Sequence, residues 1–107
     1  METVNGLPTA YGTTHCGAPG EMGGPCNEPI GRGSTVELPD YGWHTWTLQV
    51  DRTNGEGDWR GEAIRWMVDG KVFHEVTGGQ VGEEGVWATL AHAPMFMILN
   101  VAVGGDG

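Results

Sequence analysis

Basic residues are scarce in this 107-residue sequence, which has 5 Lys and Arg against 14 Asp and Glu and a formal net charge of −9 at pH 7. A protein that binds nucleic acid needs clustered cations to neutralise phosphates, and an anionic membrane surface attracts the same kind of patch. The composition therefore argues against nucleic acid and against a membrane surface as partners.

Long hydrophobic runs are also missing. The longest apolar stretch near the C-terminus, residues 95–99, falls far short of the roughly 20 residues that a transmembrane helix needs. Residues 1–6 contain an acid and a turn dipeptide, where a secretory signal would have basic residues followed by an apolar run. We therefore expect neither a membrane span nor a signal peptide in this chain.

Cysteine is limited to Cys16 and Cys26, and no Cys/His pair lies nearby at zinc-binding spacing. The sequence therefore gives no reason to assign a metal or another cofactor. The Gly- and Pro-rich segment between the two residues forms a short loop that a disulfide could close. Two reduced, buried thiols are the alternative, and a disulfide would indicate an oxidising compartment.

Glycine, by contrast, is abundant, with 20 residues and no collagen period, and the segments between are rich in Trp, Val and Ile. Such a pattern is typical of many short strands joined by turns. Residues 43–50 alternate between apolar and polar side chains, which predicts a strand with one buried face. Residues 63–68 and 71–76 alternate in the same way on either side of Asp69 and Gly70, which predicts a β-hairpin.

The remaining segments complete an all-β prediction. We expect another strand at 11–15, a long strand buried on both faces at 95–103, and a short helix at 85–92 before Pro94. Residues 17–39 and 53–61 have no periodicity and are predicted to be connectors. Together these elements indicate an antiparallel β-sandwich. Because so few strands cannot cover such apolar faces, we expect the chain to be a fragment of a larger sandwich.

Five blocks of the sequence carry a resemblance to a known family: residues 1–6, 11–17, 43–46, 64–70 and 96–105. In order and content they resemble glycoside hydrolase family 16, and within it the fungal endo-1,3(4)-β-glucanases of the laminarinase type. The resemblance implies a concanavalin-like β-jelly-roll whose concave face holds a β-glucan chain. It also implies a retaining hydrolase of β-1,3 or mixed β-1,3/1,4 glucan, secreted in its full-length form.

The catalytic signature of that family is Glu-x-Asp-x-x-Glu on one strand, giving the nucleophile, a supporting aspartate and the general acid/base. Glu2 matches the final glutamate, and the first two carboxylates have no counterpart in the sequence. We therefore expect residues 1–107 to be the central part of one such domain, truncated at both ends and inactive alone. Without the resemblance, Glu2 would be interpreted as a solvated N-terminal residue. A non-catalytic glucan-binding or structural β-sandwich module is the alternative function.

Two further residues are candidates for substrate binding. His15 matches a histidine that the family places on the cleft floor, although a capping or core role is equally consistent with its position. Asn5 could contact sugar, but Asn5 and Gly6 are more simply a tight turn. The histidines His44, His74 and His92 are interpreted as packed or surface residues, and Glu83 and Glu84 as a solvated turn.

The five tryptophans could stack on sugar rings or pack in a core. Core packing is the better interpretation for Trp46 and Trp66, because both lie on apolar alternating faces. The roles of Trp43, Trp59 and Trp87 remain open at this point.

Overall fold

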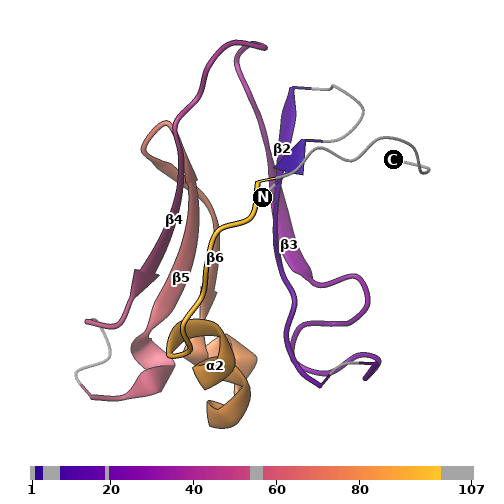
Figure 1. Cartoon of the computed structure of the whole chain (residues 1–107), viewed down its shortest axis with the longest axis vertical. Coiled ribbons are helices and arrows are strands. Elements are labelled where there is room, and N and C mark those ends of the chain that lie inside the picture. The colour runs from indigo at the N-terminus through magenta and orange to yellow at the C-terminus, as the bar shows by residue number, and fades with distance from the viewer. Residues whose placement is uncertain (1, 4–7, 19, 54–56, 100–107) are drawn as a thin grey trace.

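The computed structural model of the chain describes residues 2–3, 8–18, 20–53 and 57–99. Two three-stranded antiparallel sheets face each other, with the order β1-β2-β3 in one and β4-β5-β6 in the other (Figure 1). The predicted antiparallel β-sandwich is therefore confirmed. The strands are β1 (Glu2–Thr3), β2 (Thr9–Thr14), β3 (Arg32–Glu37), β4 (Trp46–Asp51), β5 (Ala63–Val68) and β6 (Lys71–Thr77).

Three short helices accompany the strands: η1 (Trp59–Gly61), α1 (Gly78–Val81) and α2 (Glu84–Ala91). The helix predicted at 85–92 corresponds to α2. Thr77 and Gln80 form a reciprocal capping box at the start of α1, so β6 leads directly into a helix. Among the residues described, no helix has the length and apolar character needed to cross a membrane.

The predicted hairpin is present between β5 and β6. Asp69 and Gly70 both have positive φ, at 51° and 82°, as a two-residue turn matched to the twist of its strands requires. The partner of β5 changes from His74 to Val72 between Trp66 and Met67, which leaves Phe73 as the extra residue of a β-bulge. The alternation in the sequence did not reveal this bulge.

The hydrophobic core lies between the β5–β6 part of its sheet and the two α-helices. Trp87 and Val76 are almost completely buried there. Ile64, Trp66, Val81 and Ala91 complete the cluster, and Cys16 packs against it from the other sheet. Burying an aromatic or branched aliphatic side chain contributes about 1.5–3 kcal/mol, so this cluster is the main stabilising element of the described structure.

The two sheets meet where β2 and β3 approach β6. An added Cβ at Gly12 of β2 would lie 2.9 Å from the ring of Phe73, so glycine lets the sheets approach closely here. His74 is buried at the same junction, within hydrogen-bonding distance of Thr14 Oγ1 (3.4 Å) and Ser34 Oγ (3.2 Å). Its burial lowers the pKa of the imidazole, which favours the neutral form.

Three sequence-based expectations differ from the structure. The connector predicted at 17–39 contains β3, which shows no apolar alternation and includes Gly33, a residue unfavourable in strands. Pairing with β2 along the whole strand supplies the stabilisation instead. The strand predicted from residue 43 begins at Trp46, and its apolar face is exposed rather than buried. Trp46 itself, expected in the core, is 41% exposed.

The third difference concerns the C-terminal strand expected at 95–103. Residues 95–99 are not in a strand, and their side chains are 65–88% exposed. A strand needs a hydrogen-bonded neighbour, and within the described ranges no strand pairs with this segment. Residues 100–103 lie outside the described residues.

Candidate functional site

The outward face of the β1-β2-β3 sheet is the first part of the candidate site. Along β2, Ala10, Gly12 and Thr14 are buried toward the other sheet. Tyr11 and Thr13 alternate with them and are partly exposed on the opposite face. This outward face therefore presents a phenol and a hydroxyl group.

The strand register places Glu2 on the strand next to these residues. Glu2 of β1 is opposite Tyr11, and Tyr11 is opposite Thr35 of β3, so the three positions form one row across the sheet. The side chain of Glu2 is outside the part of the chain that the structure describes. The whole of Asn5, the second predicted substrate-binding residue, is outside it as well.

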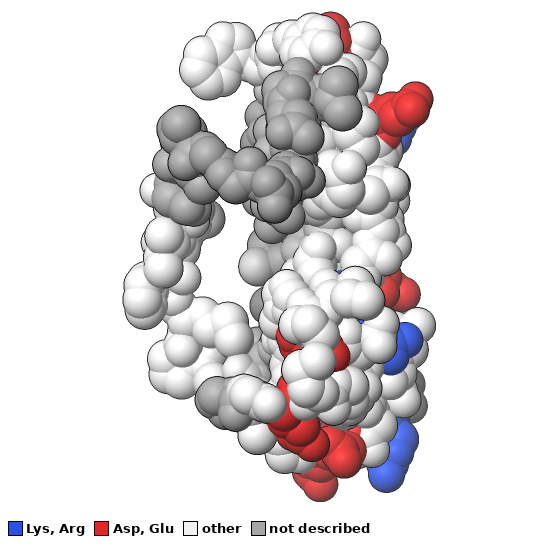
Figure 2. Space-filling view, turned by 90° about the vertical axis from the view of Figure 1, so that its right-hand side faces the viewer, with Lys and Arg blue, Asp and Glu red and all other residues white. Residues whose placement is uncertain are grey.

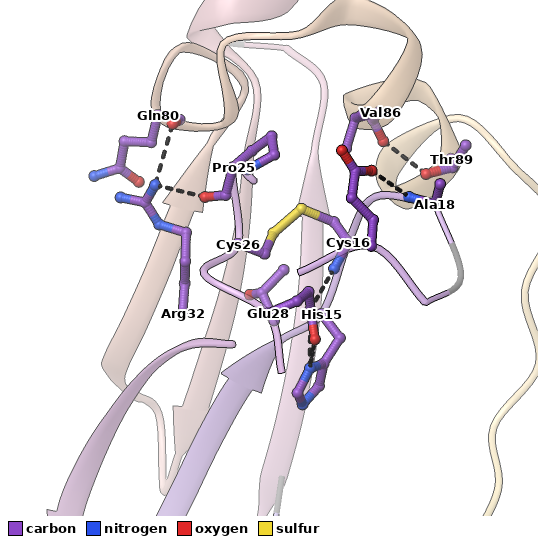
Figure 3. The surroundings of a disulfide bond; sticks show 12 residues. His15, Cys16, Ala18, Pro25, Cys26, Glu28, Arg32, Gln80, Val86 and Thr89 are labelled. Atoms are coloured by element: carbon purple, nitrogen blue, oxygen red, sulfur yellow. Dashed lines mark hydrogen bonds and ion pairs between the residues drawn. A yellow bond between two sulfur atoms is a disulfide. The ribbon is translucent and has the colours of Figure 1, made fainter. Parts of the chain in front are cut away.

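His15 follows the end of β2 directly and has a carboxylate partner (Figure 3). Its Nδ1 lies 3.0 Å from both carboxylate oxygens of Glu28. The His15 side chain is 58% exposed and that of Glu28 is 19% exposed. The alternative of a core role for His15 therefore does not agree with the structure.

A disulfide supports this pair. Cys16 and Cys26 are bonded, as the loop composition predicted (Figure 3). Cys26 is fully buried, and the backbone N–H of Cys16 donates to Glu28 Oε1 over 3.1 Å. The backbones of Gly23 and Glu28 exchange two hydrogen bonds, which closes the turn that contains Cys26. The loop and the end of β2 therefore hold His15 and Glu28 together.

Glu28 is a residue that the sequence reasoning did not single out. A signal was present, because Glu28 lies two positions after Cys26 and His15 lies one position before Cys16. Once the two cysteines are bonded, the backbones at these two residues lie near each other. The contact between the two side chains depends in addition on how the loop folds back.

His44 and His92, expected to be packed or surface residues, both contact carboxylates. His44 has a largely buried side chain between Asp69 (2.7 Å) and Asp40 (3.0 Å), and its pKa is raised mainly by the hydrogen bond with Asp69. His92 donates to Glu62 Oε1 over 2.7 Å and lowers the pKa of that carboxyl, with a smaller contribution from Trp87. Both pairs stabilise loops or helix ends away from the β1-β2-β3 face.

A third charged cluster lies on the outward face of the other sheet. Arg65 donates to Asp51 (2.9 Å) and Glu75 (2.6 Å), and the pKa of Asp51 is held far below its usual range by hydrogen bonds from Thr53 and Arg65. These groups satisfy one another, as expected for a structural ion-pair network. Within the described part of the chain, no group of three or more His, Cys, Asp or Glu side chains is arranged to hold a metal ion.

The tryptophans divide between the core and the surface. Trp66 and Trp87 are buried in the core, which bears out the expectation for Trp66. Trp59 packs against the core from η1, where the guanidinium of Arg60 lies 4.6 Å from its ring centre. Trp43 is fully exposed in the segment before β4. None of these is a residue of the β1-β2-β3 sheet, whose aromatic side chain on the outward face is Tyr11.

The surface on this side of the molecule is mainly uncharged. Figure 2 looks at the molecule from the β1-β2-β3 side and shows acidic side chains at the lower end, at the top and along the right-hand edge, where the larger basic groups also lie. Broad uncharged surface lies between them. A surface of this kind suits a neutral polymer better than a polyanion.

Comparison with known proteins places the fold. The chain is similar to the crystal structure of an endo-1,3-β-glucanase from Streptomyces sioyaensis, with a TM-score of 0.68 and 38% sequence identity. The alignment covers 82% of this chain and 30% of that one, so the chain spans less than a third of the enzyme's length. The fold is therefore a glucanase-like antiparallel β-jelly-roll. No protein-family model matches the chain, and no curated protein matches it.

Proposed function

We propose that residues 1–107 form the central part of a single glycoside hydrolase family 16 domain of the laminarinase type. In this proposal the full-length enzyme is secreted and hydrolyses β-1,3 or mixed β-1,3/1,4 glucan. The observation that carries it is the 38% identity to an endo-1,3-β-glucanase, together with the shared fold. The Cys16–Cys26 disulfide supports an oxidising destination.

Glu2 is the general acid/base in this proposal. A retaining glycosidase uses two carboxyl groups roughly 5 Å apart: one attacks the anomeric carbon and the other protonates the leaving oxygen, then activates water. Glu2 lies in β1, next to the hydroxyl-bearing residues of β2. Among residues 1–107, only Glu2 matches a catalytic carboxylate of the family signature. The chain alone should therefore bind glucan without hydrolysing it at the rate of an intact enzyme.

The glucan lies across the outward face of β1, β2 and β3 in this proposal. Tyr11 offers an aromatic ring and a hydroxyl, and Thr13 and Thr35 offer further hydroxyl groups on neighbouring strands. Sugar rings stack their C–H faces on aromatic rings, and their hydroxyls exchange hydrogen bonds with side chains of this kind. His15 follows the last residue of β2, four positions along the chain from Tyr11.

The test has two parts. The 107-residue chain is run through gels containing laminarin or an α-glucan, with Tyr11→Ala as the variant and Met67→Ala, on the other sheet, as the matched control. We expect retardation by laminarin alone, weakened by Tyr11→Ala and unchanged by Met67→Ala. Equal mobility in both gels would contradict the proposed substrate.

The second part measures reducing sugar released from laminarin by the full-length enzyme. Removing a general acid/base costs about 10²–10⁴-fold in rate, so Glu2→Gln should reduce turnover by that factor. Full turnover by the Glu2→Gln enzyme would refute the assigned role. Laminarin binding without hydrolysis by the full-length protein would instead favour the non-catalytic glucan-binding module.

A further inference from the structure

We infer that Glu28 is a positioning residue for His15, which it fixes in the tautomer that presents Nε2 as a hydrogen-bond acceptor. The inference rests on the proposed function only for the identity of the ligand, a hydroxyl group of a β-glucan. The geometry of the two side chains carries the rest.

The contact itself selects the tautomer. A carboxylate accepts hydrogen bonds and donates none, and both oxygens of Glu28 lie 3.0 Å from His15 Nδ1. The hydrogen of the neutral imidazole therefore belongs on Nδ1. Nε2 is left with a lone pair, and which nitrogen of a histidine carries hydrogen decides what the ring can do.

Three interactions hold Glu28 in place beside His15. The Cys16–Cys26 disulfide joins the residue after His15 to the residue two positions before Glu28. The backbone N–H of Cys16 donates to Glu28 Oε1 (Figure 3). The backbone of Glu28 also exchanges two hydrogen bonds with that of Gly23. A side chain held in this way loses little conformational entropy when a ligand arrives.

The ring is also accessible to a ligand. His15 and Glu28 line an open pocket of about 250 Å³ together with Gly17, Ala18 and Glu21. The exposed fraction of His15 is about three times that of Glu28, so the imidazole faces solvent and the carboxylate lies behind it. This arrangement suits an acceptor that receives a hydroxyl O–H from the solvent side.

Two substitutions in the same loop separate this role from a purely structural one. In Glu28→Gln the amide oxygen can still accept from the Cys16 N–H, and the amide NH₂ then faces His15 Nδ1 as a donor. The tautomer with hydrogen on Nδ1 should therefore lose population to the one with hydrogen on Nε2, while the fold is unchanged. Glu21→Gln is the matched control, because the Glu21 carboxylate accepts from the Ala18 N–H and has no described contact with His15.

The experiment is long-range ¹H–¹⁵N NMR of the His15 imidazole in the disulfide-bonded 107-residue chain, at a pH high enough to make the ring neutral. We expect hydrogen on Nδ1 in the parent chain and in Glu21→Gln, and a clearly larger fraction with hydrogen on Nε2 in Glu28→Gln. Hydrogen on Nε2 in the parent chain would overturn the inference without any variant. A folded Glu28→Gln chain with the same tautomer ratio as the parent chain would overturn it as well.

A titration with laminari-oligosaccharide separates this inference from the proposed function. One neutral hydrogen bond is worth about 0.5–1.5 kcal/mol, so Glu28→Gln should weaken binding by about 2- to 12-fold, and Glu21→Gln should not. If neither the parent chain nor either variant binds laminari-oligosaccharide, the proposed substrate is contradicted. The NMR measurement of the His15 tautomer tests the role of Glu28 independently of that result. Equal affinity of the parent and Glu28→Gln would refute Nε2 as a sugar acceptor.

Discussion

The inner face of the β4-β5-β6 sheet is exposed along β4 and buried along β5 and β6. Trp46, Leu48 and Val50 of β4 are 41%, 58% and 45% exposed. Their direct partners on β5 are Val68, Trp66 and Ile64, which are 7%, 7% and 5% exposed. Each exposed apolar residue is thus paired with a buried one on the same face.

The difference comes from the elements that lie above each half. The helices α1 and α2 and the strands β2 and β3 pack on β5 and β6, and no described element covers β4 in the same way (Figure 1). Alternation in a sequence identifies the apolar face of a strand, but burial depends on a tertiary neighbour. The covered half should therefore respond strongly to substitution and the β4 half only weakly.

Matched tryptophan substitutions should give the largest contrast. Trp66→Ala removes a buried ring and should lower the free energy of unfolding by about 3–5 kcal/mol. Trp46→Ala removes a half-exposed ring and should cost about 1 kcal/mol or less. Urea unfolding followed by circular dichroism measures both. An equal loss of unfolding free energy in the two variants would show that the apolar face of β4 is covered in solution.

Removing the disulfide should have the next largest effect. The bond closes a short loop with a sequence separation of 10 residues, and the chain-entropy model gives about 2–3 kcal/mol for that size. Cys16→Ser with Cys26→Ser should therefore lower the midpoint of urea unfolding, and reducing agent should do the same to the parent chain. A reduced parent chain as stable as the oxidised one would contradict this prediction.

Two glycines of the α-helices form a third contrast, within the covered half. A Cβ at Gly78 would lie within contact of the Trp59 carbonyl oxygen, so Gly78→Ala should cost about 2–3 kcal/mol. Nothing lies near a Cβ at Gly85 in α2, so Gly85→Ala should be neutral or stabilise by up to about 1 kcal/mol. Thermal unfolding of both variants checks this. The reverse order would mean that α1 does not pack on η1 as described.

The smallest predicted effect depends on pH. Glu62 is buried under α2 and accepts from Trp87 and His92, which lower the pKa of its carboxyl below the ordinary value of 4.5. Its contribution to stability is therefore fully present above pH 4.5 and is lost as pH falls through the lowered pKa. Glu62→Gln should cost about 1–2 kcal/mol at pH 7 and less near pH 3, measured by urea unfolding at both pH values. A cost that does not change with pH would contradict an ionised Glu62 carboxylate in the folded chain.

Local signals made part of this structure predictable. The hairpin around Asp69 and Gly70 and the helix α2 follow from turn chemistry and short-range periodicity. The sequence allowed either a disulfide or two reduced thiols, and the short Gly- and Pro-rich loop between Cys16 and Cys26 favoured the disulfide. β3 could not be predicted in this way, because Gly33 is unfavourable in strands, the segment shows no apolar alternation, and its pairing with β2 is a long-range interaction.

The site residues stay predictions from the resemblance, which offered Glu2, His15 and Asn5. The register places Glu2 on the strand next to the one that ends before His15. The contact between His15 and Glu28 depends on how the disulfide loop folds back, so no pattern of adjacent residues reveals it. The exposure of Leu48 and Val50 was missed for the same reason, since a sequence pattern does not show which elements pack above a strand.

We propose that the outward face of β1-β2-β3 binds β-glucan and that the β4-β5-β6 sheet does not. Amide chemical-shift mapping of the ¹⁵N-labelled chain with laminari-oligosaccharide tests it most directly. We predict saturable shifts at Tyr11, Thr13 and Thr35, and unchanged resonances at Thr47 and Gln49 of β4. Shifts centred on β4, or none at saturating oligosaccharide, would contradict the account.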